Sequence, residues 1–428
     1  MTITESKEML VNNNVKLLFS ELYGNNNLRI ENQGTRYTNL LDRFVATFPF
    51  DTDFKIYSVP GRTEVGGNHT DHNAGRVLAA AIDLDILAVV SPSDDDIITI
   101  HSDGFANIII NTNETNPIPE EKFTSAALVR GVSSRLKQLG FKTGGFKALI
   151  DGKVPNGSGL SSSAAFEVLI ATILNSLYNQ NWIDGITIAK IAQYAENDFF
   201  GKPCGLMDQT ACSLGGLVFI DFKDFNNPII EKMDYNFSEQ GYSIIIVDTG
   251  SNHADMNDDY TALEEEMKTV AKSLGGNVLR EISKQKVIEN ISLLREKIND
   301  RAILRAFHFF DDDNRVTEQV NALKKNDLTK FFSLINESGL SSWMLCQNCY
   351  SSKCIEKQGI SIALTLTKEI LKDKGAWRVH GGGFAGTIQS FVPNHLAVEY
   401  KSKMKSLFGA GACHEIFIRS HGALEVKF

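Results

Sequence analysis

A glycine- and serine-rich stretch at residues 154–165 carries the residue types best suited to bind a phosphate group. It reads Val-Pro-Asn-Gly-Ser-Gly-Leu-Ser-Ser-Ser-Ala-Ala and leads into an apolar-periodic run that ends at Leu177. Glycine permits backbone conformations that a side chain forbids. A tight loop that opens a helix directs several N–H groups at one point, where the helix dipole favours negative charge. The serine hydroxyls add donors, and their oxygens suit Mg²⁺. The stretch predicts a phosphate-binding loop, with an ordinary serine-capped helix start as the alternative.

A second polar cluster, at residues 60–73, combines Arg62, His69, Asp71 and Asn73 with several glycines. Guanidinium, imidazole, carboxylate and amide groups form a set of donors and acceptors that suits a ligand with many hydroxyl groups. Taken alone, the cluster is better explained as a polar turn.

A third cluster places an acidic residue on a predicted helix ahead of a glycine-containing turn. Glu196 is followed by Gly-Lys-Pro-Cys-Gly-Leu-Met-Asp-Gln at residues 201–209. Glu196 would complete an Mg²⁺ site with the serines, and Asp208 would orient or deprotonate a hydroxyl that attacks phosphorus. The alternatives are a solvated helix face for Glu196 and a cap for Asp208.

A fourth cluster, residues 378–386, holds three successive glycines, which allow close backbone approach to a ligand or form a simple turn.

Hydrophobic periodicity predicts the elements that must position these clusters. A strand at 146–150 enters the glycine- and serine-rich stretch, and a strand at 55–59 is expected to end at Pro60 and Gly61. Residues 107–119 are predicted to be irregular. Further predicted strands lie at 77–90, 96–100, 217–222, 242–247, 386–391 and 415–418. Predicted helices lie within 1–55 and at 126–139, 186–199, 260–274, 286–297, 316–324 and 362–371.

Composition and charge narrow the class of protein. The chain has 428 residues, of which 43% are hydrophobic and 22% charged, as is typical of a globular protein large enough for two domains. A net charge of −9 argues against nucleic acid or an anionic membrane as the main partner. No secretory signal or membrane-spanning run is apparent, so we expect a cytoplasmic protein. The sparse cysteines fit reduced thiols, and Cys346, Cys349 and Cys354 lack the further ligands that a zinc site needs.

In this order, the four clusters resemble the GHMP small-molecule kinases, a family that includes galactokinase, homoserine, mevalonate and phosphomevalonate kinases. The cluster at 60–73 is similar to the galactokinase signature, which reads roughly Gly-Arg-Val-Asn-Leu-Ile-Gly-Glu-His-Thr-Asp-Tyr-Asn-Gly-Gly. The resemblance extends from about residue 55 to the C-terminus. Further matches are Ser251, His253, Tyr260, His308, Arg315 and residues 420–423.

The resemblance implies a role for each matching residue. Arg62 matches the arginine that stabilises phosphoryl transfer, and Asp208 matches the candidate base for the anomeric hydroxyl of the sugar. The positions that contact the sugar are Asn68, His69, Asp71 and Tyr260. The positions that bind ATP are Pro155, Gly157, Ser158, Gly159, Leu160, Ser161, Ser162 and Ser163. The positions that hold Mg²⁺ are Ser162, Ser163 and Glu196.

The fold that the resemblance implies is α+β with two lobes and an active site in the cleft between them. The N-terminal lobe would be similar to ribosomal protein S5 domain 2, and the C-terminal lobe would be ferredoxin-like. We expect an N-terminal domain at residues 1–225, with the galactose-binding signature at about 55–80 and the phosphate loop at 154–165, and a C-terminal domain at residues 226–428. The expected activity is transfer of the ATP γ-phosphate to the anomeric (C1) hydroxyl of a hexose, with galactose favoured, by a monomer or weak homodimer.

Three departures from the family pattern leave the acceptor sugar open. Asn68 stands where the signature has a Glu that contacts the hydroxyl on sugar carbon 6, His72 replaces Tyr, and Val379-His380 replaces Met-Thr. A neutral Asn would not repel a carboxylate on carbon 6, whereas a Glu would. Galacturonate, or a modified hexose, is therefore an alternative acceptor.

A non-catalytic sensor that binds sugar and ATP is the alternative from another class. Known sensors of that type lose part of the Ser-Ser-Ala loop, whereas residues 160–165 are intact here and Arg62 and Asp208 are both present. A plain binding module does not explain why the metal and acid–base positions occur together. An enzyme is therefore the favoured interpretation.

Overall fold

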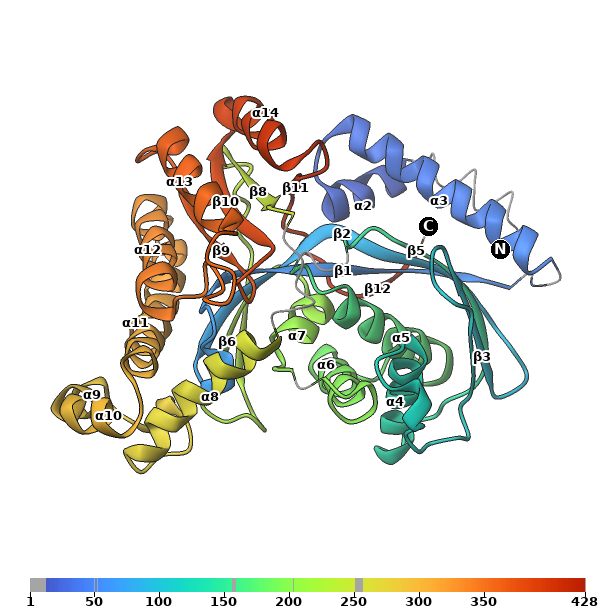
Figure 1. The fold of residues 1–428 in the computed structure, drawn as a ribbon. Coiled ribbons are helices and arrows are strands. Elements are labelled where there is room, and N and C mark those ends of the chain that lie inside the picture. The colour runs from blue at the N-terminus through green and yellow to red at the C-terminus, as the bar shows by residue number, and fades with distance from the viewer. Residues whose placement is uncertain are drawn as a thin grey trace.

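The computed structural model describes residues 13–49, 51, 53–155, 159–202, 204–250 and 257–427. This part of the chain contains helices and two β-sheets, so the prediction of an α+β fold is confirmed. Figure 1 shows the larger sheet across the middle, helices on both of its faces, and the smaller sheet beside it. None of the helices in the described ranges is long and apolar enough to cross a membrane.

The larger sheet is built around a long antiparallel hairpin. Its strands β1 (Lys55–Gly66) and β2 (Arg76–Pro92) pair with register irregularities at positions 60–62 and 64–66. Such bulges re-aim side chains and are common next to active sites. Residues 67–75 form the tip of the hairpin, so the polar cluster spans the bulged end of β1 and this tip.

The other strands extend the hairpin on both sides. Their order is β12-β1-β2-β5-β3-β4, and β6 and β7 branch from β2. The strands are β3 (Ile97–Ser102), β4 (Ile108–Asn111), β5 (Phe146–Gly152), β6 (Leu217–Asp221), β7 (Ile229–Met233) and β12 (Leu424–Val426). Because β12 comes from the end of the chain and pairs with β1, the last residues join the sheet formed by the first half. The domain boundary near residue 225 stays a prediction.

Helices cover both faces of the larger sheet (Figure 1). One face carries α4 (Ser125–Gln138), α5 (Ser162–Tyr178), α6 (Gly185–Tyr194) and α7 (Met207–Leu214). The opposite face carries α2 (Asn13–Tyr23) and α3 (Asn27–Thr47). Helix α5 is apolar on most sides because it lies in the middle of its layer and is almost entirely buried.

The smaller sheet has the antiparallel order β11-β8-β10-β9. Its strands are β8 (Tyr242–Asp248), β9 (Ala376–His380), β10 (Thr387–Pro393) and β11 (Cys413–Ile416). The helices of this half are α8 (Asn257–Ser273), α9 (Lys284–Glu289), α10 (Ile291–Lys297), α11 (Asp300–Lys324), α12 (Leu328–Ser341), α13 (Gly359–Leu371) and α14 (Ala397–Phe408). Helix α11 contacts both β1 and β2, and the turn between β9 and β10 carries the three successive glycines, so this half meets the hairpin.

The structure corrects several of the element predictions. Strand β1 continues through Pro60 and Gly61 because the bulge there accommodates a proline, which cannot donate to a regular ladder. Residues 107–119 contain β4. The predicted helix at 286–297 is divided into α9 and α10 at Asn290, and the predicted helix at 316–324 is the last part of the longer α11.

The two N-terminal helices belong to the folded core. Arg36 on α3 donates to Asp85 Oδ1 at 2.5 Å and to Asp151 Oδ2 at 2.5 Å, which ties the helix to β2 and β5. Apolar side chains on the same helix pack against the sheet, and the buried ones are Tyr37, Leu40, Leu41 and Phe44.

Replacing Leu41 with Ala should lower the free energy of unfolding by about 2–5 kcal/mol, because the fully buried side chain leaves a cavity between helix and sheet. Leu28→Ala on the same helix is the matched control, since Leu28 is 66% exposed and its loss should change stability by less than ~0.5 kcal/mol. Urea unfolding of the full chain measures both. Equal effects from the two variants would show that these helices are not packed as described.

Candidate active site

Residues from separate parts of the chain meet around a small cavity of about 180 Å³ (the small cavity). They come from β1, the hairpin tip, the start of α7 and the glycine turn between β9 and β10. The lining residues are Arg62, Glu64, His69, Asp71, Cys204, Gly205, Met207, Asp208, Gly381 and Gly382. A cavity this small, with several charged and polar groups, suits a small ligand that carries many hydroxyl groups.

Arg62 and Asp208 form a bidentate ion pair at one side of the small cavity. Arg62 Nε donates to Asp208 Oδ1 at 2.7 Å, and Nη2 donates to Oδ2 at 2.7 Å. Arg62 Nη1 also donates to the carbonyl of Gly159, and Ser161 Oγ donates to Asp208 Oδ2. Two parallel N–H···O bonds fix geometry more strictly than one. The predicted catalytic pair is thus assembled and joined to the predicted phosphate loop.

The charge state of Asp208 follows from these contacts. Burial by itself would raise its pKa, but the charge of Arg62 and hydrogen bonds from Arg62 and Ser161 outweigh it, so the pKa lies below the ordinary value. Asp208 is therefore a carboxylate at neutral pH, able to accept a hydrogen bond from a hydroxyl group.

His69 and Asp71 face the small cavity from the hairpin tip. Burial lowers the pKa of His69 to about 4, so its ring is neutral, and Nε2 donates to the carbonyl of Gly382 at 2.8 Å. Burial and the nearby charge of Glu64 raise the pKa of Asp71 to about 7. A Cβ on Gly205 would lie 2.5 Å from Asp71 Oδ2, so glycine is needed for this close approach.

The other two predicted sugar contacts lie behind the small cavity. The Asn68 side chain is fully buried and hydrogen-bonded within the protein. Tyr260, on α8, donates to the carbonyl of Gly383 at 2.9 Å and packs edge-on against Phe384. A Cβ on Gly382 would lie 2.3 Å from the Tyr260 ring, so this tyrosine supports the glycine turn. Direct sugar contact by Tyr260 stays a prediction, whereas the Asn68 side chain is occupied by hydrogen bonds within the protein.

The predicted phosphate loop enters α5 next to the small cavity. Gly157 and Ser158 lie outside the described residues, as do Ser251 and His253. Leu160 accepts a hydrogen bond from the backbone N–H of Arg62 at 3.1 Å. Ser161 has φ 58° and ψ 59°, a left-handed conformation that a non-glycine residue rarely adopts, and it precedes the first helical residue, Ser162. This conformation lets Ser161 donate to Asp208 while α5 begins beside it.

Ser163 and Glu196 provide oxygen atoms that fit Mg²⁺. Ser163 Oγ lies 3.2 Å from Glu196 Oε1, and Glu196, on the π-helical turn Ala195–Phe200, is 3% exposed. Gln209 donates to Glu196 Oε2 at 2.9 Å and to the buried Glu167 at 3.3 Å. Burial and the charge of Glu196 raise the pKa of Glu167 well above its ordinary value, which favours its neutral form, and Lys202 Nζ lies 3.8 Å from Glu196 Oε1.

This donor set is typical of an Mg²⁺ site that a substrate completes, and not of a metal site formed by protein ligands alone. The described residues hold no group of three or more His, Cys, Asp or Glu side chains that would bind a metal alone. Proteins commonly bind Mg²⁺ through one or two carboxylates together with the phosphate oxygens of a substrate. Ser162, predicted as a third ligand, lies with Ser163 at the edge of the large cavity described next.

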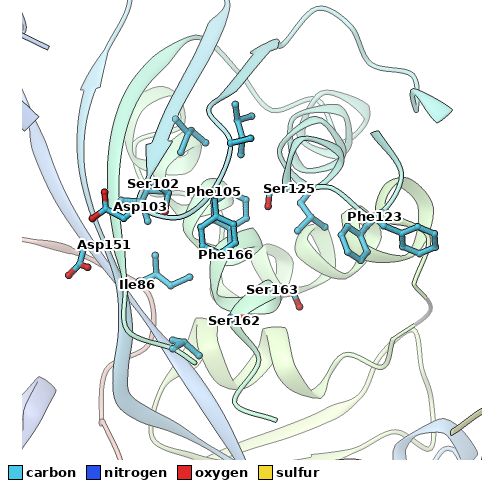
Figure 2. Close-up of a pocket in the computed structure, with 18 residues that line it drawn as sticks. Ile86, Ser102, Asp103, Phe105, Phe123, Ser125, Asp151, Ser162, Ser163 and Phe166 are labelled. Atoms are coloured by element: carbon cyan, nitrogen blue, oxygen red, sulfur yellow. The ribbon is translucent and has the colours of Figure 1, made fainter. Parts of the chain in front are cut away.

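A large cavity of about 390 Å³ opens beside the start of α5 (Figure 2). Its walls are mainly apolar and include Phe105, Phe123 and Phe166, with Asp103 at the edge. Phenylalanine rings provide flat apolar surfaces suited to a heteroaromatic base. This cavity was not predicted from the sequence, because its lining comes from separate strands and helices and has no shared motif.

Two further residues contribute to the site without a role having been predicted for them. Glu64 lines the small cavity, although it was not among the residues singled out from the sequence. His380 hydrogen-bonds Thr63 at 2.9 Å and Thr387 at 2.9 Å, so its imidazole joins β1 to β10 beneath the site. A residue-by-residue comparison with the galactokinase signature would have found Glu64.

Comparisons with known proteins agree with this geometry. The model of the GHMP kinases N terminal domain matches residues 127–216, and the model of the galactokinase galactose-binding signature matches residues 42–92. The crystal structure of Lactococcus lactis galactokinase complexed with galactose is similar to this chain, with a TM-score of 0.79 and 23% identity over 91% of this chain and 100% of that one.

Two other solved structures share the fold at lower similarity. Methanococcus jannaschii mevalonate kinase has a TM-score of 0.60 and 17% identity over 86% of this chain and 98% of that one. Streptococcus pneumoniae phosphomevalonate kinase, in complex with phosphomevalonate and AMPPNP, has a TM-score of 0.57 and 14% identity over 87% of this chain and 99% of that one. Residues 127–216 thus match the GHMP kinase N-terminal domain, residues 42–92 match the galactokinase galactose-binding signature, and the chain shares the fold of these kinases.

Proposed function

We propose that the chain transfers the γ-phosphate of ATP to the anomeric (C1) hydroxyl of a hexose, with galactose as the leading acceptor. The observation that carries this proposal is the Arg62–Asp208 pair, which lines the small cavity and contacts the phosphate loop through Gly159 and Ser161. A hydroxyl bound in the small cavity would meet a carboxylate and a guanidinium at the edge of that loop. The match to the galactose-binding signature supports galactose.

In this reaction the anomeric oxygen forms a bond to the γ-phosphorus as the bond from that phosphorus to the bridging oxygen breaks, and ADP leaves. Asp208 accepts a hydrogen bond from the hydroxyl and takes its proton during the transfer. Because the pKa of Asp208 lies below the ordinary value, it is a weak base, and much of its effect comes from orienting the hydroxyl. Arg62 stabilises negative charge on the transferring group.

The large cavity and the phosphate loop would bind ATP on the other side of the pair. The base would lie among the phenylalanine rings, and the phosphates would reach the start of α5, where backbone N–H groups and the helix dipole favour anions. Mg²⁺, held by Ser163 and Glu196 with Ser162 beside them, would neutralise charge on the phosphate oxygens.

The experiment that tests this proposal is ADP release from ATP and Mg²⁺ with a panel of sugars. The panel contains galactose, galacturonate, glucose, N-acetylgalactosamine and arabinose, with Asp208→Asn as the blank. Sugar-dependent ADP release with galactose is the expected result. Turnover of galacturonate but not of galactose would show that the acceptor is a uronic acid. No turnover with any sugar, combined with protection by galactose against thermal unfolding, would instead support a sensor.

Replacing Phe105 with Ala should raise the KM for ATP roughly 5- to 30-fold with little change in kcat, because losing the apolar contact between this ring and the nucleotide weakens binding of the ground and transition states equally. Phe105 is 56% exposed at the large cavity, so nucleotide would cover surface that is otherwise open to water. Trp182→Ala is the control, since Trp182 is 81% exposed and does not line this cavity. An unchanged KM for ATP in Phe105→Ala would show that the nucleotide does not bind in this cavity.

A further inference from the structure

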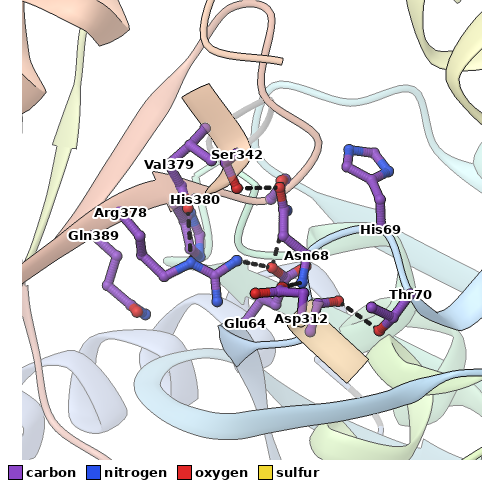
Figure 3. Close-up of polar contacts among 12 residues, drawn as sticks. Glu64, Asn68, His69, Thr70, Asp312, Ser342, Arg378, Val379, His380 and Gln389 are labelled. Atoms are coloured by element: carbon purple, nitrogen blue, oxygen red, sulfur yellow. Dashed lines mark hydrogen bonds and ion pairs between the residues drawn. The ribbon is translucent and has the colours of Figure 1, made fainter. Parts of the chain in front are cut away.

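A buried polar network lies directly behind the small cavity and is centred on Glu64 (Figure 3). Glu64 Oε1 accepts hydrogen bonds from Arg378 Nη2 and, at 3.1 Å, from Asn68 Nδ2. Arg378 is on β9 and is fully buried, and its Nε donates to the carbonyl of Val379 at 3.0 Å. A carboxylate held by two partners on the same oxygen has one preferred orientation.

The Asn68 side chain has no capacity left for a ligand. Its Nδ2 donates to Glu64 and, at 2.8 Å, to the carbonyl of Gly381. Its Oδ1 accepts from Asn348 Nδ2 at 2.8 Å and from Ser342 Oγ at 3.2 Å. An amide side chain offers two N–H groups and two lone pairs, so these four bonds use all of them. Asn68 is also fully buried.

Glu64, in contrast, keeps one oxygen available. The residue lines the small cavity and is 5% exposed. Both of its hydrogen bonds are to Oε1, and no residue that the structure describes donates to Oε2. Oε2 is therefore an acceptor in position for a ligand hydroxyl.

Glu64 and Asn68 also exchange places relative to the family signature. Aligned on Arg62 and His69, the signature has Asn where this chain has Glu64, and Glu where this chain has Asn68. The two positions are four residues apart on the bulged end of β1 and the hairpin tip, and their side chains are hydrogen-bonded to each other. One acid and one amide are thus retained at this pair of positions, with their order reversed.

We propose that Glu64 determines acceptor specificity in the sugar kinase inferred above: its Oε2 accepts a hydroxyl of a neutral hexose and its charge excludes a uronic acid. Arg378 and Asn68 act as positioning residues that hold the carboxylate. This inference rests on the proposed function. Galacturonate was considered because Asn68 is neutral, but Glu64 supplies a carboxylate next to it, so a uronic acid is disfavoured.

The charges around the small cavity support a neutral acceptor. Glu64, Asp71 and Asp208 all line it. The Arg62 guanidinium is bound to Asp208, and Arg378 is fully buried and does not line the small cavity, so neither cation is placed to pair with a carboxylate on the sugar. Burial raises the pKa of Glu64, while the charge of Arg378 opposes that rise. A uronate would therefore place its carboxylate beside other carboxyl groups with no cation among the described residues positioned to pair with it, which is an effective means of rejecting a ligand.

The test compares galactose with galacturonate in Glu64→Gln. With Oε1 still bound to Arg378 and Asn68, the variant presents an amide N–H where the free acceptor was, and it removes the negative charge. We expect kcat/KM for galactose to fall roughly 10- to 100-fold, as loss of a hydrogen bond to a charged group predicts. We expect galacturonate turnover to stay the same or to rise, so that selectivity changes. A loss of folded structure would lower both rates together.

Two further variants keep the test decisive. Glu64→Asp retains the charge on a shorter side chain, so galactose turnover should weaken while galacturonate stays rejected. Glu266→Gln is the matched control, because Glu266 also pairs with a buried arginine, Arg305, at 2.9 Å but does not line the small cavity. It should leave the selectivity unchanged.

The outcomes separate this inference from the proposed function. If the wild-type chain phosphorylates galactose and Glu64→Gln has the same selectivity, Glu64 does not select and the inference is overturned while the function stands. A wild-type preference for galacturonate would overturn it in the same way. If no sugar is phosphorylated, the proposed function fails, and calorimetric binding decides: weaker galactose binding by Glu64→Gln supports the role of Glu64, and equal or absent binding overturns it.

Discussion

Replacing Asp208 with Asn is expected to lower kcat for galactose phosphorylation by roughly 10²- to 10⁴-fold, the range by which a positioned acid–base group accelerates a reaction. Asn has nearly the same shape, and its single oxygen can still accept from Arg62 Nη2 and Ser161 while the second Arg62 bond is lost, so the fold and the small cavity should persist. It cannot accept the proton of the hydroxyl, and it lacks the charge that orients the O–H group. Steady-state ADP release at saturating sugar measures this loss.

Asp221→Asn is the control for Asp208→Asn. Asp221 is also a buried carboxylate paired with arginines, since Arg76 Nε and Arg280 Nη2 each lie 2.9 Å from its Oδ2, but it does not line the small cavity. It should lower stability without a comparable loss of kcat. Sugar protection against thermal unfolding should survive in Asp208→Asn. If Asp208→Asn kept a kcat near the wild-type value, Asp208 would have no part in the phosphoryl transfer.

Replacing Arg62 with Ala is expected to lower kcat by about 10³-fold, near the lower end of the range for an arginine that stabilises transferring phosphate. The loss includes a second effect, because Asp208 then lacks the cation that offsets its burial. Its pKa should rise, so the remaining activity should fall on acidification at a pH where the wild-type chain, with Asp208 still ionised, is unaffected.

The Arg62→Ala, Asp208→Asn double variant tests whether the two residues act as a unit. Residues that share one interaction show strongly non-additive effects. We therefore expect the double variant to be about as slow as the slower single variant. Losses that multiply would show that the bidentate pair does not act together in the transfer.

Much of the site was predictable because its residues lie in short, ordered motifs. Residue types together with the family resemblance indicated a phosphate loop at 154–165 and an acidic partner at Glu196, and the structure places Ser163 Oγ 3.2 Å from Glu196 Oε1. Pro60 and Gly61 misled the prediction of β1, since proline and glycine usually end a strand. Here they form a bulge inside a strand, and the bulge sets the direction of Arg62.

The remainder was not predictable because it depends on contacts distant in sequence. Glu64 and Arg378 are separated by 314 positions, and only the approach of β9 to β1 brings them together. Asn68 looked like a sugar contact from its place in the signature, but its four hydrogen bonds come from residues of both halves of the chain. Local sequence patterns indicate elements and motifs. They do not indicate which hydrogen-bonding groups of a side chain are already used by contacts within the fold.

The position of the new phosphate group on the sugar distinguishes an anomeric kinase from every other sugar kinase. Galactose is incubated with ATP, Mg²⁺ and the full chain, and the product is examined by phosphorus–proton correlation NMR. We expect one product in which phosphorus couples to the anomeric proton, formed in equal amount to ADP and formed roughly 10²-fold or more slowly with Asp208→Asn. Phosphorus coupled to the protons on carbon 6, or ADP released at the same rate without sugar, would contradict it.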